Sequence, residues 1–279
     1  MNERGVRSMN GIRLDWKRDG YFFERDALKS APGPWQQWAY ILDQAVQGNF
    51  QDTTGLLEVY FSTENRLLRD ACCRLLGDAG STEAIQKWVA HLRTRFANFD
   101  PVGGDTALDL SNSLAVHGQL LFVPEVLRLL EWNMGVPDSR IFPLHLSLML
   151  EERWGPIAEY PSTDEAFPAY KAQVMGRVLE LSQGLGSEQA HVFMGRVSHV
   201  PDIARLLLEN LGSSHFEEAS QWLLRRRFEA STGINCSSFF KDGRFQPLTA
   251  AAVLEEFLSS DEAARFVPGR KYFFGRWVP

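Results

Sequence analysis

The sequence predicts a mainly α fold, an α-solenoid in which antiparallel helix pairs stack into one elongated domain over residues 1–279. Three observations support this prediction. Apolar residues recur at helical spacing through most of the chain, short Gly, Ser and Pro turns separate these stretches, and no stretch can bury its apolar stripe alone. Short strand-like segments are expected only near the two ends. A boundary between two halves is expected near residues 154–163, where Pro156 and Pro161 interrupt the helical pattern.

The clearest helical pattern lies between Asp52 and Phe99. From Glu64 to Gly77, apolar residues recur every three or four positions and charged residues fall on the opposite side, which is typical of a helix with one buried face. The turn at 77–80 ends this helix, and Ser81 offers an N-cap for the next one. The predicted buried stripe consists of Leu67, Leu68, Ala71, Cys72, Leu75 and Leu76.

Similar patterns predict further helices at 35–46, 105–117, 124–132, 140–151, 163–183, 188–198, 202–211, 216–230 and near 249–258. The helix at 140–151 is strongly apolar, so its large side chains are predicted to lie in the centre of the stack: Ile141, Leu144, Leu148 and Met149.

Both ends of the chain carry aromatic stripes. Near the N-terminus, Asp19-Gly20 between two apolar runs predicts a small hairpin. We expect both stripes to cover the stack, because the last helix pair would otherwise leave its apolar face in water. The residues are Ile12, Leu14, Trp16, Tyr21 and Phe23 at one end, and Tyr272, Phe273, Phe274, Trp277 and Val278 at the other.

Composition limits the class of protein. Of 279 residues, 44% are hydrophobic and 23% are charged, which is typical of a globular protein with a sizeable core. No apolar run approaches the length of a membrane span and the first residues lack the apolar core of a signal peptide, so a cytoplasmic protein without membrane contact is predicted. The net charge of −6 argues against nucleic-acid binding; it fits a basic protein partner, or solubility alone.

The sequence contains no enzyme signature that we can identify: no dinucleotide fingerprint, phosphate loop, nucleophile elbow or zinc-protease motif. The six histidines are scattered, and the three cysteines have neither metal nor disulfide spacing. Arg225-Arg226-Arg227 is predicted to lie on the outer side of an amphipathic helix, with phosphate contact as the alternative. We therefore predict no catalytic, cofactor or metal site, although an enzyme without a known motif stays open.

Several segments resemble a known family. Residues 67–80 resemble the second helix of a HEAT-type repeat. Residues 233–236, 242–248 and 269–275, together with 146–151 and 155–160, resemble bacterial HEAT-like immunity proteins that are paired with polymorphic or type VI secreted toxins. This resemblance implies a protein that binds and silences a cognate toxin, often a nuclease, inside the producing cell. It implies no catalytic residues.

The resulting hypothesis is an immunity protein that neutralises its toxin by protein–protein contact. The alternative is a HEAT-type scaffold or adaptor with another protein ligand, and self-association stays open. An acidic surface would attract a basic toxin such as a nuclease. We expect acidic residues bordering the central loops to contact the partner: Asp100, Asp105, Glu151, Glu152, Glu159, Asp164 and Glu165.

Overall fold

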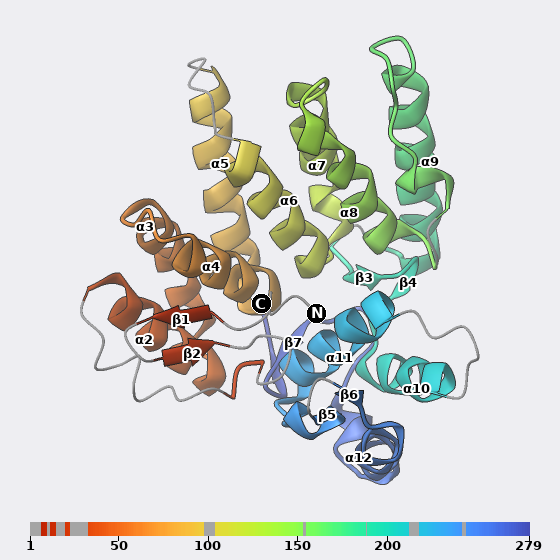
Figure 1. The fold of residues 1–279 in the computed structure, drawn as a ribbon. Coiled ribbons are helices and arrows are strands. Elements are labelled where there is room, and N and C mark those ends of the chain that lie inside the picture. Colours follow the sequence, from red (N-terminus) through yellow and green to blue (C-terminus); the bar gives the residue numbers. More distant parts are fainter. Residues whose placement is uncertain are drawn as a thin grey trace.

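The structure is a computed structural model that describes residues 7–9, 12–14, 20–22, 33–97, 104–152, 155–187, 189–211, 218–241 and 244–279. The prediction of a mainly helical chain is confirmed (Figure 1). Within the described ranges, strands occur in four antiparallel hairpins of two strands each. The chain is thus a set of helices joined by short turns, with hairpins at defined junctions.

The helices are α2 (Pro34–Gln47), α3 (Leu56–Phe61), α4 (Arg66–Ala79), α5 (Thr82–Ala97), α6 (Gly104–His117), α7 (Val123–Trp132), α8 (Ile141–Leu150), α9 (Phe167–Leu185), α10 (Val200–Leu211), α11 (Glu218–Thr232) and α12 (Pro247–Ser259). The strands are β1 (Arg7–Met9), β2 (Ile12–Leu14), β3 (Val192–Phe193), β4 (Arg196–Val197), β5 (Phe240–Lys241), β6 (Arg244–Phe245), β7 (Tyr272–Phe273) and β8 (Arg276–Trp277). Two short 3-10 helices border the site described below, η3 (Pro137–Arg140) and η4 (Pro156–Ala158).

Helix α4 shows how the pattern becomes structure. The Asn65 side chain accepts hydrogen bonds from the backbone N–H groups of Leu67 and Leu68 and so caps the first turn. The predicted stripe of α4 is buried except for Leu67, which is half-buried. Gly77 lets α6 approach closely, because a Cβ atom there would lie 3.0 Å from the Cβ of Val116.

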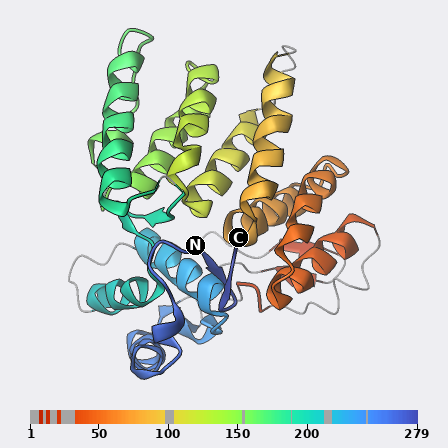
Figure 2. The same cartoon turned by 180° about the vertical axis from the view of Figure 1, so that it is seen from behind.

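The helices α4, α6 and α8 contact one another in that order and form the middle of the molecule. Helices α7 and α9 contact each other and α8. Figures 1 and 2 show α5 to α9 side by side, with α10, α11 and α12 grouped below this row of helices.

Two hydrophobic cores result from this arrangement. The first combines residues of α2 to α9, and it also includes Phe273 and Val278 from the C-terminal segment. It runs through Ile157 and Phe167, so the segment 154–163, where we expected a boundary, lies alongside the first core. The second core begins at Phe193 and combines residues of α10, α11 and α12.

Residues from late in the chain donate hydrogen bonds to the carbonyl groups at the C-terminal ends of α4, α6 and α8. The last carbonyl groups of a helix have no partner within it and need donors from elsewhere. The Lys271 ammonium donates to the carbonyl of Gly77 at the end of α4, and Arg227 donates to that of Val116 at the end of α6, over 2.5 Å. The backbone N–H of Met194 donates to the carbonyl of Leu148 near the end of α8, over 2.8 Å.

The helix predicted at 188–198 is wrong, because residues 192–197 form the β3–β4 hairpin. Its sequence HVFMGRV (191–197) parallels KYFFGRW (271–277) in the β7–β8 hairpin. In each turn a large residue and a glycine have positive φ, 50° and 68° at Met194 and Gly195, and 49° and 73° at Phe274 and Gly275. Their N–H groups donate to carbonyls at the ends of α8 and α11 respectively. The turns act as helix caps.

The C-terminal aromatic stripe packs on the body, as predicted, with one exception. Phe273 and Val278 are buried, and the ring of Tyr21 meets that of Phe273 edge to face at 5.3 Å between centroids. Trp277 is 54% exposed, because it lies on the outer side of β8 against the Arg270 guanidinium.

The structure pairs β1 with β2, residues 7–9 with 12–14, whereas Asp19 and most of the hairpin expected around Asp19-Gly20 lie outside the described residues. Trp16 and Phe23 lie outside the described residues. Among the described residues, no helix is both long and apolar enough to cross a lipid bilayer.

Candidate partner-binding surface

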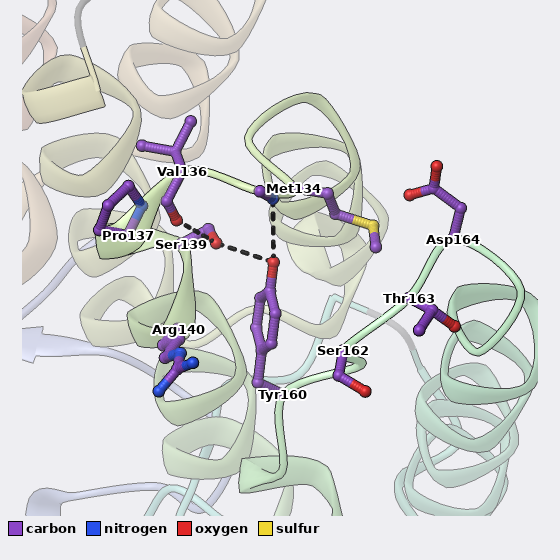
Figure 3. A pocket seen from close by; sticks show the side chains of 10 residues that line it. Met134, Val136, Pro137, Ser139, Arg140, Tyr160, Ser162, Thr163 and Asp164 are labelled. Atoms are coloured by element: carbon purple, nitrogen blue, oxygen red, sulfur yellow. Dashed lines mark hydrogen bonds between the residues drawn. The ribbon is translucent and has the colours of Figure 1, made fainter.

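A pocket of about 450 Å³ opens where α7 ends and α8 begins (Figure 3). We call it the Tyr160 pocket, because the Tyr160 ring stands between its two walls. One wall comes from the turn that joins α7 to α8, and the other comes from the loop before α9. The lining residues are Met134, Gly135, Val136, Pro137, Ser139, Arg140, Tyr160, Ser162, Thr163 and Asp164.

Local sequence explains the first wall. The side-chain amide of Asn133 donates to the carbonyl of Leu129 over 2.7 Å and so ends α7. Gly135 follows with a φ of 82°, a backbone conformation that glycine adopts without strain. The N–H of Ser139 then donates to the carbonyl of Val136 over 3.0 Å, which closes the 3-10 turn η3. The chain therefore reverses within a few residues and leaves Val136 pointing outward.

Hydrogen bonds fix the second wall against the first. The N–H of Gly135 donates to the Tyr160 hydroxyl over 3.2 Å, and Ser139 Oγ lies 3.0 Å from the same hydroxyl. Farther along, the buried hydroxyl of Tyr170 on α9 donates to the carbonyl of Ile157 over 2.8 Å. Both walls are thus held by contacts made inside this chain, so the pocket is largely formed before any partner binds.

Large apolar side chains remain exposed beside the pocket. Trp132, Val136, Ile141 and Leu144 are 42%, 44%, 40% and 38% exposed. The prediction that Ile141 and Leu144 lie in the centre of the stack is therefore wrong, although Met149 is buried. Helix α8 has no continuous polar face; it packs against α6, α7 and α9, yet Ile141 and Leu144 near its start stay exposed. These four residues and the Tyr160 pocket are together called the docking surface.

The rim of the docking surface is acidic. In the segments 131–141 and 155–166 there are five acidic residues, all exposed, and one basic residue, Arg140. Hydrogen bonds from its own backbone N–H and from the Thr163 hydroxyl lower the pKa of Glu165, so its negative charge persists at neutral pH. The five acids are Glu131, Asp138, Glu159, Asp164 and Glu165.

The structure places the seven predicted contact residues in different settings. Asp164 lines the pocket, and the exposed Glu159 and Glu165 are next in sequence to the lining residues Tyr160 and Asp164. Glu151 points inward: Ser147 Oγ donates to its carboxylate over 2.5 Å and the backbone N–H groups of Gly155 and Ile157 do so over 3.1 Å. The exposed Glu152 pairs with Arg196 at 2.6 Å. Asp105 lies in α6 with its side chain not described, and Asp100 lies outside the described residues.

Sequence reasoning missed the other part of the docking surface. Glu131, Asp138 and Val136 border a turn that we had treated only as a connection, and Ile141 and Leu144 were assigned to the core. One signal was present in the sequence. The ten-residue helix that follows the turn at 135–137 has no polar face, so it has more apolar surface than one neighbouring helix can cover.

A second group of polar residues, here called the junction cluster, lies between the two cores and is buried except for Arg226, which is half-buried. It consists of Asp78, His117, His191, Arg226, Arg227 and Lys271. The Arg226 guanidinium pairs with Asp78 at 2.9 Å, and the Tyr21 hydroxyl donates to the same carboxylate over 2.7 Å. Lys271 Nζ lies 3.2 Å from His117 Nδ1.

The junction cluster corrects the prediction for Arg225-Arg226-Arg227. Arg225 and Arg227 are buried rather than outward, because the Glu229 carboxylate and the end of α6 receive their charges. Burial lowers the pKa of Lys271 well below its usual range, with the charge of Arg227 adding to the effect. Since these cations donate to backbone carbonyls and to carboxylates of the fold, the arrangement joins the two cores.

Within the described ranges, no three His, Cys, Asp or Glu side chains are grouped so that they could hold a metal ion. The three cysteines are buried free thiols, and burial raises the pKa of Cys72 and Cys73 well above the usual value. No protein-family model, curated protein or solved structure matches this chain.

Proposed function

We propose that the protein is an immunity protein, which binds a cognate secreted bacterial toxin by protein–protein contact and silences it inside the producing cell without acting as an enzyme. The docking surface carries this proposal, because it leaves four large apolar side chains exposed beside a preformed pocket. Apolar surface with a polar rim is characteristic of protein interaction sites. The resemblance of the segments at 146–151, 155–160, 233–236, 242–248 and 269–275 to HEAT-like immunity proteins supports it further.

We also propose that the helices form an α-solenoid of the HEAT-like kind. The contacts of α4 with α6 and of α6 with α8 support this, since every second helix then forms one continuous row. Such a row presents the turns between helices on one edge, which is where the docking surface lies. A nuclease toxin fits the acidic rim, because nucleases bind phosphate through basic surfaces and opposite fields speed association.

Co-expression with the product of the neighbouring gene tests this function. The wild-type chain should restore growth of cells that produce the toxin, and the double variant Ile141→Asp/Leu144→Asp should restore less. Leu179→Asp is the matched control, because Leu179 is 56% exposed on α9, away from the pocket lining. The toxin recovered from protected cells should keep its intact mass. Absence of protection by the wild-type chain, or a covalent change in the toxin, would contradict the proposal.

A further inference from the structure

We propose that the docking surface receives a basic partner protein, which inserts one lysine or arginine side chain into the Tyr160 pocket and lays apolar side chains on Ile141 and Leu144. This inference rests on the proposed function in one respect only, namely that the partner is a protein. It adds the chemistry of the contact and the place where it occurs.

The two walls of the pocket differ in chemistry. Met134, Val136 and Pro137 form an apolar wall, whereas the opposite wall carries hydroxyl groups and the Asp164 carboxylate. Lysine and arginine have a matching division, with an aliphatic stem and a charged head. A volume of about 450 Å³ admits a whole side chain of this length. The face of the Tyr160 ring offers a further favourable contact for a cation.

Arg140, which lines the pocket, does not take the place that we expect for the cation of the partner. Figure 3 shows Arg140 and Asp164 on opposite sides of Tyr160, so the two charged groups do not lie side by side. Val136 and Arg140 line the pocket, and Ile141 follows Arg140 directly. Leu144 lies three residues later, on the same side of α8 as Ile141. The apolar strip therefore continues from the pocket onto the helix.

Charge decides between partners. The rim carries five acids and Arg140, and the Arg128 guanidinium lies over the Trp132 ring but is paired with Glu125. The negative charge that is left would repel a second copy of this surface, a nucleic acid or an anionic membrane. A basic protein brings the complementary field. Since the walls are already held by the Gly135, Ser139 and Tyr160 hydrogen bonds, binding need not order them first.

Peptide binding to the full chain tests this inference without knowledge of the natural partner. The probe is a short fluorescein-labelled peptide made of lysine and leucine, and its control has glutamate in place of every lysine. By fluorescence anisotropy, the lysine peptide should bind roughly tenfold or more tightly than the glutamate peptide, and its affinity should fall as salt rises. Asp164→Asn should weaken binding about two- to fivefold, as for a partly exposed ion pair. Leu144→Asp should weaken it further.

Matched variants outside the docking surface control for general effects of charge and of exposed apolar surface. Asp261→Asn and Leu179→Asp change exposed residues outside the docking surface and should leave peptide affinity unchanged. Equal affinity for the two peptides, or equal losses in the control variants, would overturn the inference. A dimer of the wild-type chain that Leu144→Asp abolishes in analytical ultracentrifugation would also overturn it, by assigning the surface to a second copy. If peptide binding behaves as expected but cells are not protected from the neighbouring toxin, the proposed function fails and this inference stands.

Discussion

The junction cluster makes the stability of this protein sensitive to mild acid through His191. This residue is buried beside His117, with 5.0 Å between the ring centroids, and its Nδ1 lies 3.3 Å from the carbonyl of Gly269. Burial, together with the charges of Lys271 and Arg227, lowers the pKa of His191 from 6.5 to about 3. We predict that His191→Gln removes part of the loss of stability that the wild-type chain suffers between pH 7 and pH 5.

The sign and size follow from proton linkage. Below pH 6.5 the unfolded chain protonates His191, whereas the folded chain keeps it neutral down to about pH 3. The unfolded state binds more protons in this window, so the free energy of unfolding falls as pH falls. Each pH unit below 6.5 lowers the free energy of unfolding by about 1.4 kcal/mol, which gives a loss of roughly 2 kcal/mol at pH 5 for this one residue. His117, whose pKa burial also lowers, adds a loss of the same sign.

Urea unfolding followed by tryptophan fluorescence, at pH 7 and at pH 5, measures this loss. His191→Gln should lower the difference in unfolding free energy between the two pH values by about 2 kcal/mol, whatever its effect at pH 7. The control His199→Gln changes a partly exposed histidine that lies 2.9 Å from Asp202, and it should keep the acid sensitivity due to His191. An unchanged pH difference in His191→Gln would refute the reasoning.

Three further predictions concern packing. Leu75 is fully buried in α4, so Leu75→Ala should lower the free energy of unfolding by about 2 to 5 kcal/mol in urea titrations, and a loss below about 0.5 kcal/mol would contradict its place in the core. Phe273→Ala should cost about 3 to 5 kcal/mol, whereas Trp277→Ala, on the paired strand of the same hairpin and exposed, should cost about 1 kcal/mol or less; equal losses would show that the hairpin is wrongly oriented. Deletion of residues 271–279 should lower the melting temperature in calorimetry and promote aggregation, and an unchanged melting point would make this segment dispensable.

The sequence predicts most helices because each amphipathic stripe finds a helical neighbour. In α4 the pattern of Leu68, Ala71 and Leu75 predicts burial correctly, since α4 packs against α6, α3 and α2. The order in which helices meet depends on contacts far apart in the chain. The contact of Lys271 with Gly77 spans 194 residues, and no local pattern encodes it.

The docking surface could be predicted only in part. Glu159, Asp164 and Glu165 follow from the rule that charged loops lie at the surface. Ile141 and Leu144 do not, because periodicity shows that a helix is apolar but not how many neighbours it has. Glu151 fails for a related reason: its neighbours in sequence are a loop whose N–H groups need an acceptor, so its carboxylate turns inward.

The β3–β4 and β7–β8 hairpins, which are similar in sequence, explain why a strongly helical chain contains strands where its pattern predicts a helix. In both turns two successive N–H groups point the same way, which requires positive φ at both residues, and the pair meets the open carbonyls at the end of α8 or α11. Met194 and Phe274 accept an unfavourable backbone conformation there, because their side chains pack against the cores. A helix at 192–197 would have left the carbonyls of Leu148 and Met149 without these donors. The repeated turn therefore supplies donors to the C-terminal ends of α8 and α11, whereas the turn at 133–140, which precedes α8, leaves Val136 and Ile141 exposed.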